Sequence, residues 1–135
     1  MTTQHTESAI GIVANFGKAL DSGDIEKAFS FFTDGTVWHQ PGNNKYSGTK
    51  HGPESIGKML SSMMQDTQGT LKIVPTDSLM LNTHLVAVPV RFSAKIGSRH
   101  IDMNGVDLYE VKHGKITQVW LFSGDQSQED DFWGK

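Results

Sequence analysis

The chain has 135 residues, with 12 basic and 15 acidic side chains, a net charge of -3 and no cysteine. This length suits a single domain spanning residues 1–135, and the absence of cysteine excludes disulfides, thiolate catalysis and cysteine-bound metals. No basic stripe, apolar signal core or membrane-spanning run is visible, so the sequence predicts a cytoplasmic protein that binds neither nucleic acid nor membranes.

The first half of the chain begins with two predicted helices. Apolar side chains, Phe16 among them, recur at helical spacing over residues 7–22 and predict the first helix. Thr6 or Ser8 can cap its start through a side-chain oxygen. A second, shorter helix is predicted for residues 24–32.

A short strand and a third helix follow. Residues 36–40 predict the strand, and residues 43–51 after it predict a loop. Pro53 suits the first turn of a helix, where its missing N–H is not needed. The apolar stripe of this helix carries Met59 and Met63, whose simplest interpretation is core packing.

The second half of the chain changes to the two-residue period of strands. Short turns separate the strands that this pattern predicts, which are residues 71–81, 85–96, 99–111 and 115–123. Helices followed by a meander of strands indicate an α+β fold in which helices cover one face of a sheet.

The last predicted hairpin places an acid in an apolar interior. A two-residue turn at residues 113–114 puts Asp107 opposite Trp120, on a face that also carries Tyr109 and Phe122. Burying a charged, unpaired carboxylate is costly, so Asp107 must be protonated, hydrogen-bonded, paired or open to a wet cavity. A desolvated acid has a raised pKa and can serve as a catalytic acid, whereas a hydrogen-bonded one is structural.

The opposite face of the same hairpin is also apolar. The predicted register puts Val106 and Leu108 on it, beside Val119 and Leu121. A small sheet that is apolar on both faces predicts a partner, and we expect a homodimer packed through the outer sheet face. The alternative is a sheet edge covered by the C-terminal tail.

Several segments together resemble one known family in their order and spacing. They are Gly105–Tyr109 followed by Gly114, Lys115, Ile116 and Trp120, residues 20–24, and residues 37–42 followed by Ser47, Gly48 and Gly52. This pattern resembles the SnoaL-like polyketide cyclases and ketosteroid isomerases of the nuclear transport factor 2-like superfamily. The resemblance implies a cone-shaped, curved mixed or antiparallel sheet wrapped by N-terminal helices around a deep apolar cavity.

The resemblance also implies roles for individual residues. Asp107 stands where the cyclases keep an acid or base and the isomerases a protonated Asp that donates to an oxyanion. His39 stands where the isomerases keep a general base, although a core histidine bonded to the backbone is an equal alternative. Phe16 stands where the isomerases keep a tyrosine in the first helix as a second hydrogen-bond donor to the oxyanion, and it has no hydroxyl. Epoxide hydrolysis is a further enzymatic alternative because of Arg91, although the matching strands show no Asp-Arg-Asp triad.

These residues predict a ligand pocket and leave two functions open. The expected lining is Phe16, Trp38, Met59, Met63, Tyr109, Trp120 and Phe122. In the first function, His39 removes a proton next to a carbonyl and Asp107 donates to the enolate oxygen or returns the proton. Such an enzyme would cyclise, isomerise or dehydrate a small apolar, polyketide-like compound without a cofactor. In the second, the pocket binds its ligand without turnover. The histidines are scattered, so no metal site is predicted.

Overall fold

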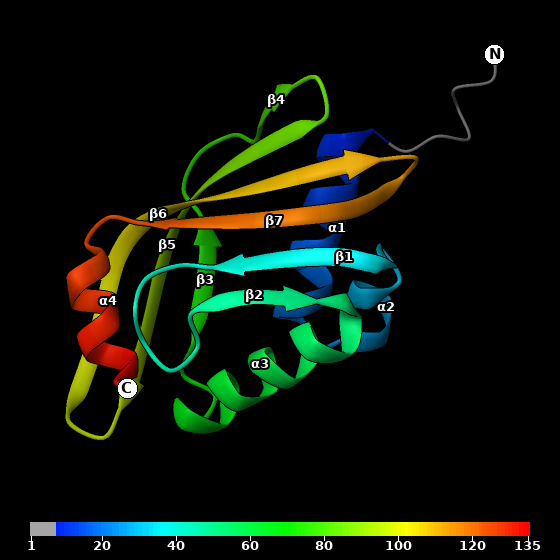
Figure 1. Cartoon of the computed structure of the whole chain (residues 1–135). Coiled ribbons are helices and arrows are strands. Elements are labelled where there is room, and N and C mark those ends of the chain that lie inside the picture. Colours follow the sequence, from blue (N-terminus) through cyan, green and yellow to red (C-terminus); the bar gives the residue numbers. More distant parts are fainter. Residues whose placement is uncertain (1–7) are drawn as a thin grey trace, which may run out of the picture.

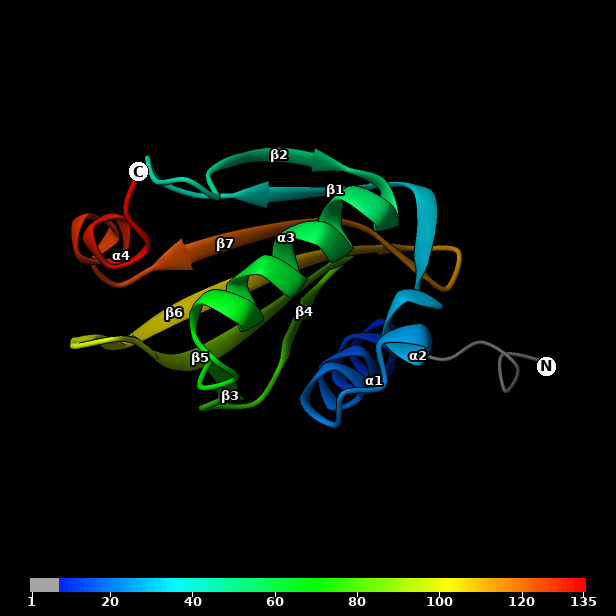
Figure 2. The ribbon, with the colours of Figure 1, turned by 90° about the horizontal axis from the view of Figure 1, so that it is seen from below.

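The structure, a computed structural model that describes residues 8–135, is a curved sheet with helices on its concave side (Figures 1 and 2). The elements in chain order are α1 (Ala9–Asp21), α2 (Ile25–Phe29), β1 (Phe32–Gln40), β2 (Gly48–His51), α3 (Gly52–Asp66), β3 (Lys72–Pro75), β4 (Met80–Asn82), β5 (Leu85–Ile96), β6 (Arg99–Lys112), β7 (Lys115–Ser123) and α4 (Gln126–Trp133). This arrangement confirms the predicted α+β class with its wrapped, curved sheet.

The strand order puts the acid-bearing strand in the middle of the sheet. The order is β2-β1-β7-β6-β5-β3, and β4 also pairs with β5. β1 runs parallel to β7, while the other strand pairs among the described residues are antiparallel. α1 contacts β5, β6 and β7, and α3 contacts β1, so both helices cover the concave face.

The helix starts follow the local signals of the sequence. Ser8 caps α1, its hydroxyl accepting a hydrogen bond from the Gly11 N–H at 3.0 Å, whereas Thr6 lies outside the described residues. Asp24 caps α2 in the same way. Pro53 lies in the first turn of α3, as predicted.

Two predicted segments differ from the structure. The loop predicted for residues 43–51 ends in β2, which pairs with β1. The single strand predicted for residues 71–81 is divided into β3 and β4, which pair with different parts of β5. Pro89 of β5 lies opposite the break and has no N–H to bond a neighbouring strand, which explains the interruption.

The register of the last hairpin is also different from the predicted one. The turn at residues 113–114 pairs Lys112 with Lys115 as predicted. Farther from the turn, the register shifts by one residue between Val111 and Glu110. Thr117 is the additional residue of this β-bulge, and its hydroxyl bonds the Glu110 carboxylate at 2.7 Å. A bulge of this kind reverses which face each later residue occupies.

The bulge corrects the faces assigned to β7. Asp107 lies opposite Leu121 rather than Trp120, and Tyr109 lies opposite Val119. Leu121 and Val119 therefore point into the concave side, and the prediction that put them on the outer face is wrong. Trp120 and its neighbour two residues along, Phe122, point outward instead.

Candidate ligand site on the concave face

Two neighbouring cross-strand pairs of β6 and β7 on the concave face differ in how far they are buried. Tyr109 and Val119 form a cross-strand pair that is buried under the helices. The next pair along the same face, Asp107 and Leu121, lies in central strands yet is only half-buried. The helices therefore cover the first pair more fully than the second, and the hollow is the partly open space above Asp107 and Leu121.

The Asp107 carboxyl faces this space without a protein partner. No hydrogen bond or ion pair joins it to another of the described residues, and Val88 and Leu121 are its cross-strand neighbours. Every fully enclosed side-chain nitrogen or oxygen in residues 8–135 has a hydrogen-bond partner. The unpartnered Asp107 oxygens must therefore meet space that a water molecule can enter.

The surroundings of Asp107 disfavour its charged form. Burial, and secondly the charge of Glu129, raise the pKa of Asp107 to about 7. An acid with this pKa exists in both protonation states near neutral pH, which suits it to proton transfer.

Glu129 reaches the site from α4, a helix that the sequence analysis treated only as a tail. Its buried carboxylate accepts hydrogen bonds from Ser123 Oγ at 2.5 Å, Gln126 Nε2 at 3.1 Å and Trp133 Nε1 at 3.1 Å. These donors replace the water that burial removes. Ser123 belongs to the concave side of β7, so Glu129 is fixed beside the same face as Asp107.

His39 lies on the other side of the sheet. Its ring stacks on Trp120, with centroids 5.1 Å apart and planes 5° apart, and its Nε2 lies 2.9 Å from Gln118 Oε1. Asp107 and His39 are thus separated by the sheet itself, and the structure does not bring the two predicted catalytic residues together. The cause is the parity of β1, which turns Trp38 inward and His39 outward.

The other predicted lining residues divide between the two faces. Phe16, Trp38, Met59, Met63 and Tyr109 are buried on the concave side. Trp120 and Phe122 lie on the outer face, and Phe122 is 55% exposed. Arg91 is also on the outer face, where its Nε lies 2.7 Å from Asp102 Oδ1.

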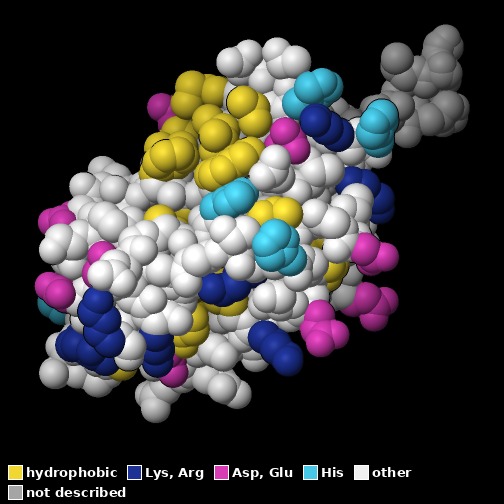
Figure 3. All heavy atoms as spheres, viewed as in Figure 1, with side chains coloured by type: hydrophobic (Ala, Val, Ile, Leu, Met, Phe, Trp, Pro, Cys, Tyr) yellow, Lys and Arg dark blue, Asp and Glu magenta, His cyan; other side chains and the backbone are white. Residues whose placement is uncertain are grey.

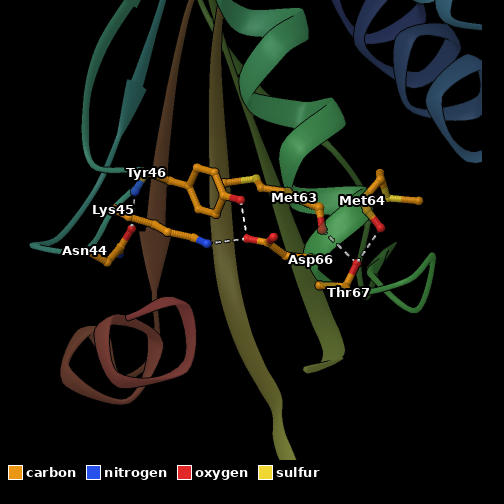
Figure 4. Close-up of polar contacts among 7 residues, drawn as sticks. All are labelled: Asn44, Lys45, Tyr46, Met63, Met64, Asp66 and Thr67. Carbon is orange, nitrogen blue, oxygen red and sulfur yellow. Dashed lines mark hydrogen bonds and ion pairs between the residues drawn. The ribbon is translucent and has the colours of Figure 1, made fainter. Parts of the chain in front are cut away.

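A polar cluster that the sequence analysis missed fixes the connection between β1 and β2 (Figure 4). Tyr46 donates a short hydrogen bond to Asp66 at the end of α3, and Lys45 Nζ lies 2.6 Å from the same carboxylate. The lysine and tyrosine contacts lower the pKa of Asp66. Asn44 Nδ2 donates to Asp130 of α4 at 2.9 Å, so this connection joins α3 to α4.

Metal sites, membrane-spanning helices and other pockets are the remaining candidate features among the described residues. In residues 8–135, no cluster of His, Asp or Glu could hold a metal ion, and no helix is long and apolar enough to span a membrane. An open depression of about 340 Å³ is lined by Asn82, Thr83, His84, Leu85, Glu110 and Lys112. It contains none of the predicted site residues.

Comparisons with known proteins agree with this fold. A protein of unknown function with a cystatin-like fold from Xanthomonas campestris is 38% identical, with a TM-score of 0.91 over 96% of this chain and 100% of that one. Bal32a, from a soil-derived mobile gene cassette, is 25% identical, with a TM-score of 0.88 over 93% and 95% of the two chains. IdmH, a candidate polyketide cyclase from Streptomyces antibioticus, shares the fold at 17% identity and a TM-score of 0.72, over 87% and 93%.

The family assignment rests on the sequence as well as on the fold. No curated protein matches the chain. The SnoaL-like domain, however, matches residues 13–119, which is most of the chain. The protein therefore belongs to the SnoaL-like domain family and has the nuclear transport factor 2-like fold.

Proposed function

We propose that the protein is a cofactor-independent acid–base enzyme that acts on a small apolar carbonyl compound in the hollow over Asp107. One observation carries this proposal: the half-buried carboxyl of Asp107 has no protein partner and has aliphatic cross-strand neighbours, and burial raises its pKa to about 7. A purely structural Asp in the same position gains stability from hydrogen bonds, and Asp107 has none with the other described residues. The fold shared with IdmH, a candidate polyketide cyclase, supports the same class of chemistry.

Asp107 performs both proton transfers in this proposal. As the carboxylate it takes a proton from the carbon next to the carbonyl, and the C–H electron pair becomes the double bond of an enolate. As the acid it then delivers a proton, the same one or one exchanged with solvent, to the same or another carbon of the substrate, so the enzyme ends unchanged. A bound apolar substrate displaces water from this space, which strengthens each electrostatic interaction there. His39 has no part, because it lies across the sheet.

Ligand binding without turnover is the second candidate function. The separation of His39 from Asp107 favours it, because the hollow then lacks the separate base that the isomerase resemblance implies. Both candidates use the same walls and differ only in whether Asp107 exchanges a proton with the ligand.

A hydrogen-exchange experiment separates the two functions. A panel of small cyclic ketones, including cyclohex-2-en-1-one, is incubated with the protein in D₂O, and loss of carbon-bound proton signals is followed by NMR. We expect exchange faster than in buffer, reduced by roughly 100-fold in Asp107→Asn, as general acid–base catalysis requires.

Other outcomes of the same exchange experiment would speak against catalysis. Ketones that bind, as shown by their line widths, but exchange at the buffer rate would identify a binding protein. Exchange at the parent's rate in Asp107→Asn, or a panel that neither binds nor exchanges, would contradict the proposal.

A further inference from the structure

Tyr109 is a second polar side chain on the concave face of β6. It follows Asp107 by two residues, so the two side chains point to the same side of the sheet. Its ring packs edge-on against Phe16, with centroids 5.9 Å apart, and its cross-strand neighbours Val86 and Val119 are fully buried. These contacts fix the ring in one position and leave Tyr109 only 7% exposed.

The hydroxyl of Tyr109 has no partner among the described residues. Fully enclosed polar atoms in this part of the chain all have one, so the hydroxyl must open onto space that water can enter. The negative charge of Asp107 acts on it, because burial and secondly Asp107 raise the pKa of Tyr109. Tyr109 thus remains a protonated donor, and its O–H is directed at no protein atom.

We propose that the Tyr109 hydroxyl donates a hydrogen bond to the carbonyl oxygen of the substrate while Asp107 transfers the proton. This inference rests on the proposed function and deepens it. When Asp107 takes the proton from carbon, negative charge develops on the substrate oxygen, and Tyr109 stabilises that charge without giving up its own proton. Their Cα atoms are roughly 7 Å apart, from the rise of about 3.3 Å per strand residue, so one small molecule can contact both side chains.

The substrate class follows from this spacing and from the aliphatic cross-strand neighbours of the two side chains. It is a compound with an apolar ring or chain and a carbonyl group, in which the oxygen reaches Tyr109 and the acidic carbon reaches Asp107. Phe16 contacts the tyrosine ring and cannot donate a hydrogen bond, so Tyr109 supplies the donor that the first helix lacks.

The only other tyrosine of the chain offers a matched control. Tyr46 is also buried, but its hydroxyl donates to Asp66 (Figure 4). Its ring packs edge-on against Trp133. Both tyrosines are therefore enclosed, and they differ in whether the hydroxyl has a protein partner.

The experiment compares Tyr109→Phe with Tyr46→Phe. In urea unfolding, Tyr109→Phe should be about as stable as the parent or more so, because it loses no hydrogen bond within the protein, and Tyr46→Phe should be less stable because it loses the bond to Asp66. Cyclohex-2-en-1-one labelled with ¹³C at the carbonyl is then bound to each protein. Its infrared carbonyl stretch should move to lower frequency in the parent and in Tyr46→Phe but not in Tyr109→Phe, and the affinity of Tyr109→Phe should fall about threefold to tenfold.

Failure of this inference is distinct from failure of the proposed function. A carbonyl stretch that moves as far in Tyr109→Phe as in the parent overturns the inference, and hydrogen exchange as fast in Asp107→Asn as in the parent overturns the proposed function. If the ketone does not bind the parent, the stability comparison decides: a Tyr109→Phe variant that is less stable than the parent makes the hydroxyl a structural group.

Discussion

Asp107 and Glu129 are two carboxyl groups on the same side of the sheet, and they differ in whether other side chains bond them. Glu129 is held by the side chains of Ser123, Gln126 and Trp133, as expected of a buried structural carboxylate. Asp107 bonds none of the described residues, and its cross-strand neighbours are aliphatic. A residue whose burial is uncompensated lowers stability, and such costs concentrate at functional sites.

The first prediction is that Asp107→Asn becomes increasingly stabilising as the pH rises. The pKa of Asp107 is about 7 in the folded state and about 3.9 in the unfolded chain. Between these values the unfolded state has lost a proton that the folded state keeps, so the parent's free energy of unfolding falls with pH, and it stays lowered above the folded pKa. Asn does not ionise and escapes this loss.

Urea unfolding of both proteins at about pH 4 and about pH 7 measures the effect. The difference between variant and parent should grow over this range by on the order of a few kcal/mol. A difference that is the same at both pH values would mean that Asp107 ionises in the folded protein as it does in the unfolded chain.

At the level of helices and strands, the sequence predicted where each segment begins and ends better than it predicted which face of the sheet each side chain occupies. The start of α3 at Pro53 and the extents of β5, β6 and β7 followed from capping and alternation. The inward direction of Asp107 and Tyr109 on β6 was also predicted. The outward direction of Trp120 was not predicted, because one additional residue, Thr117, reverses the faces of β7. Both faces of that strand carry large apolar side chains, so alternation alone gives no sign of the bulge.

The role of α4 was hidden for a different reason. Its apolar anchors, Phe132 and Trp133, are adjacent in sequence and do not show helical spacing, and the preceding residues are acidic. Glu129 therefore resembles a solvated side chain in the sequence. Only the fold shows that Ser123 and Trp133 enclose it.

The second prediction tests the link between α4 and the site. Glu129→Gln removes a negative charge that raises the pKa of Asp107, so that pKa should fall but remain above its usual range, because burial is the larger cause. NMR titration of the Asp107 carboxyl carbon measures the change. Glu54→Gln, at an exposed position in the first turn of α3, is the control and should leave the pKa where it is. An equal pKa in Glu129→Gln and the parent would exclude the electrostatic link.

At the scale of the whole molecule, part of the outer face of the sheet is apolar. Cross-strand rows on this face join Pro89 to Val106 and Phe122, and Leu108 to Trp120. Figure 3 shows hydrophobic side chains gathered on this side, close to β4. The bulge leaves the predicted surface in place and changes its members, since Trp120 and Phe122 replace Val119 and Leu121.

The third prediction is that this face joins two copies of the chain. Light scattering at micromolar concentration should give twice the chain mass of 14.9 kDa. Phe122→Glu should yield monomers, because it would bury an unpaired charge at the contact. Ile25→Glu alters another exposed apolar side chain, 50% exposed on α2, and should leave the mass unchanged. A parent protein that is monomeric at this concentration would refute the dimer.

The most direct test of the account is the titration of Asp107 in the parent protein. Its side-chain carboxyl carbon is assigned by comparison with Asp107→Asn and followed by NMR across the pH range. The hollow and the nearby charge of Glu129 predict a midpoint of about 7. A midpoint near 4, the ordinary value for Asp, would show a well-solvated or hydrogen-bonded carboxylate and would contradict the acid–base function assigned to it.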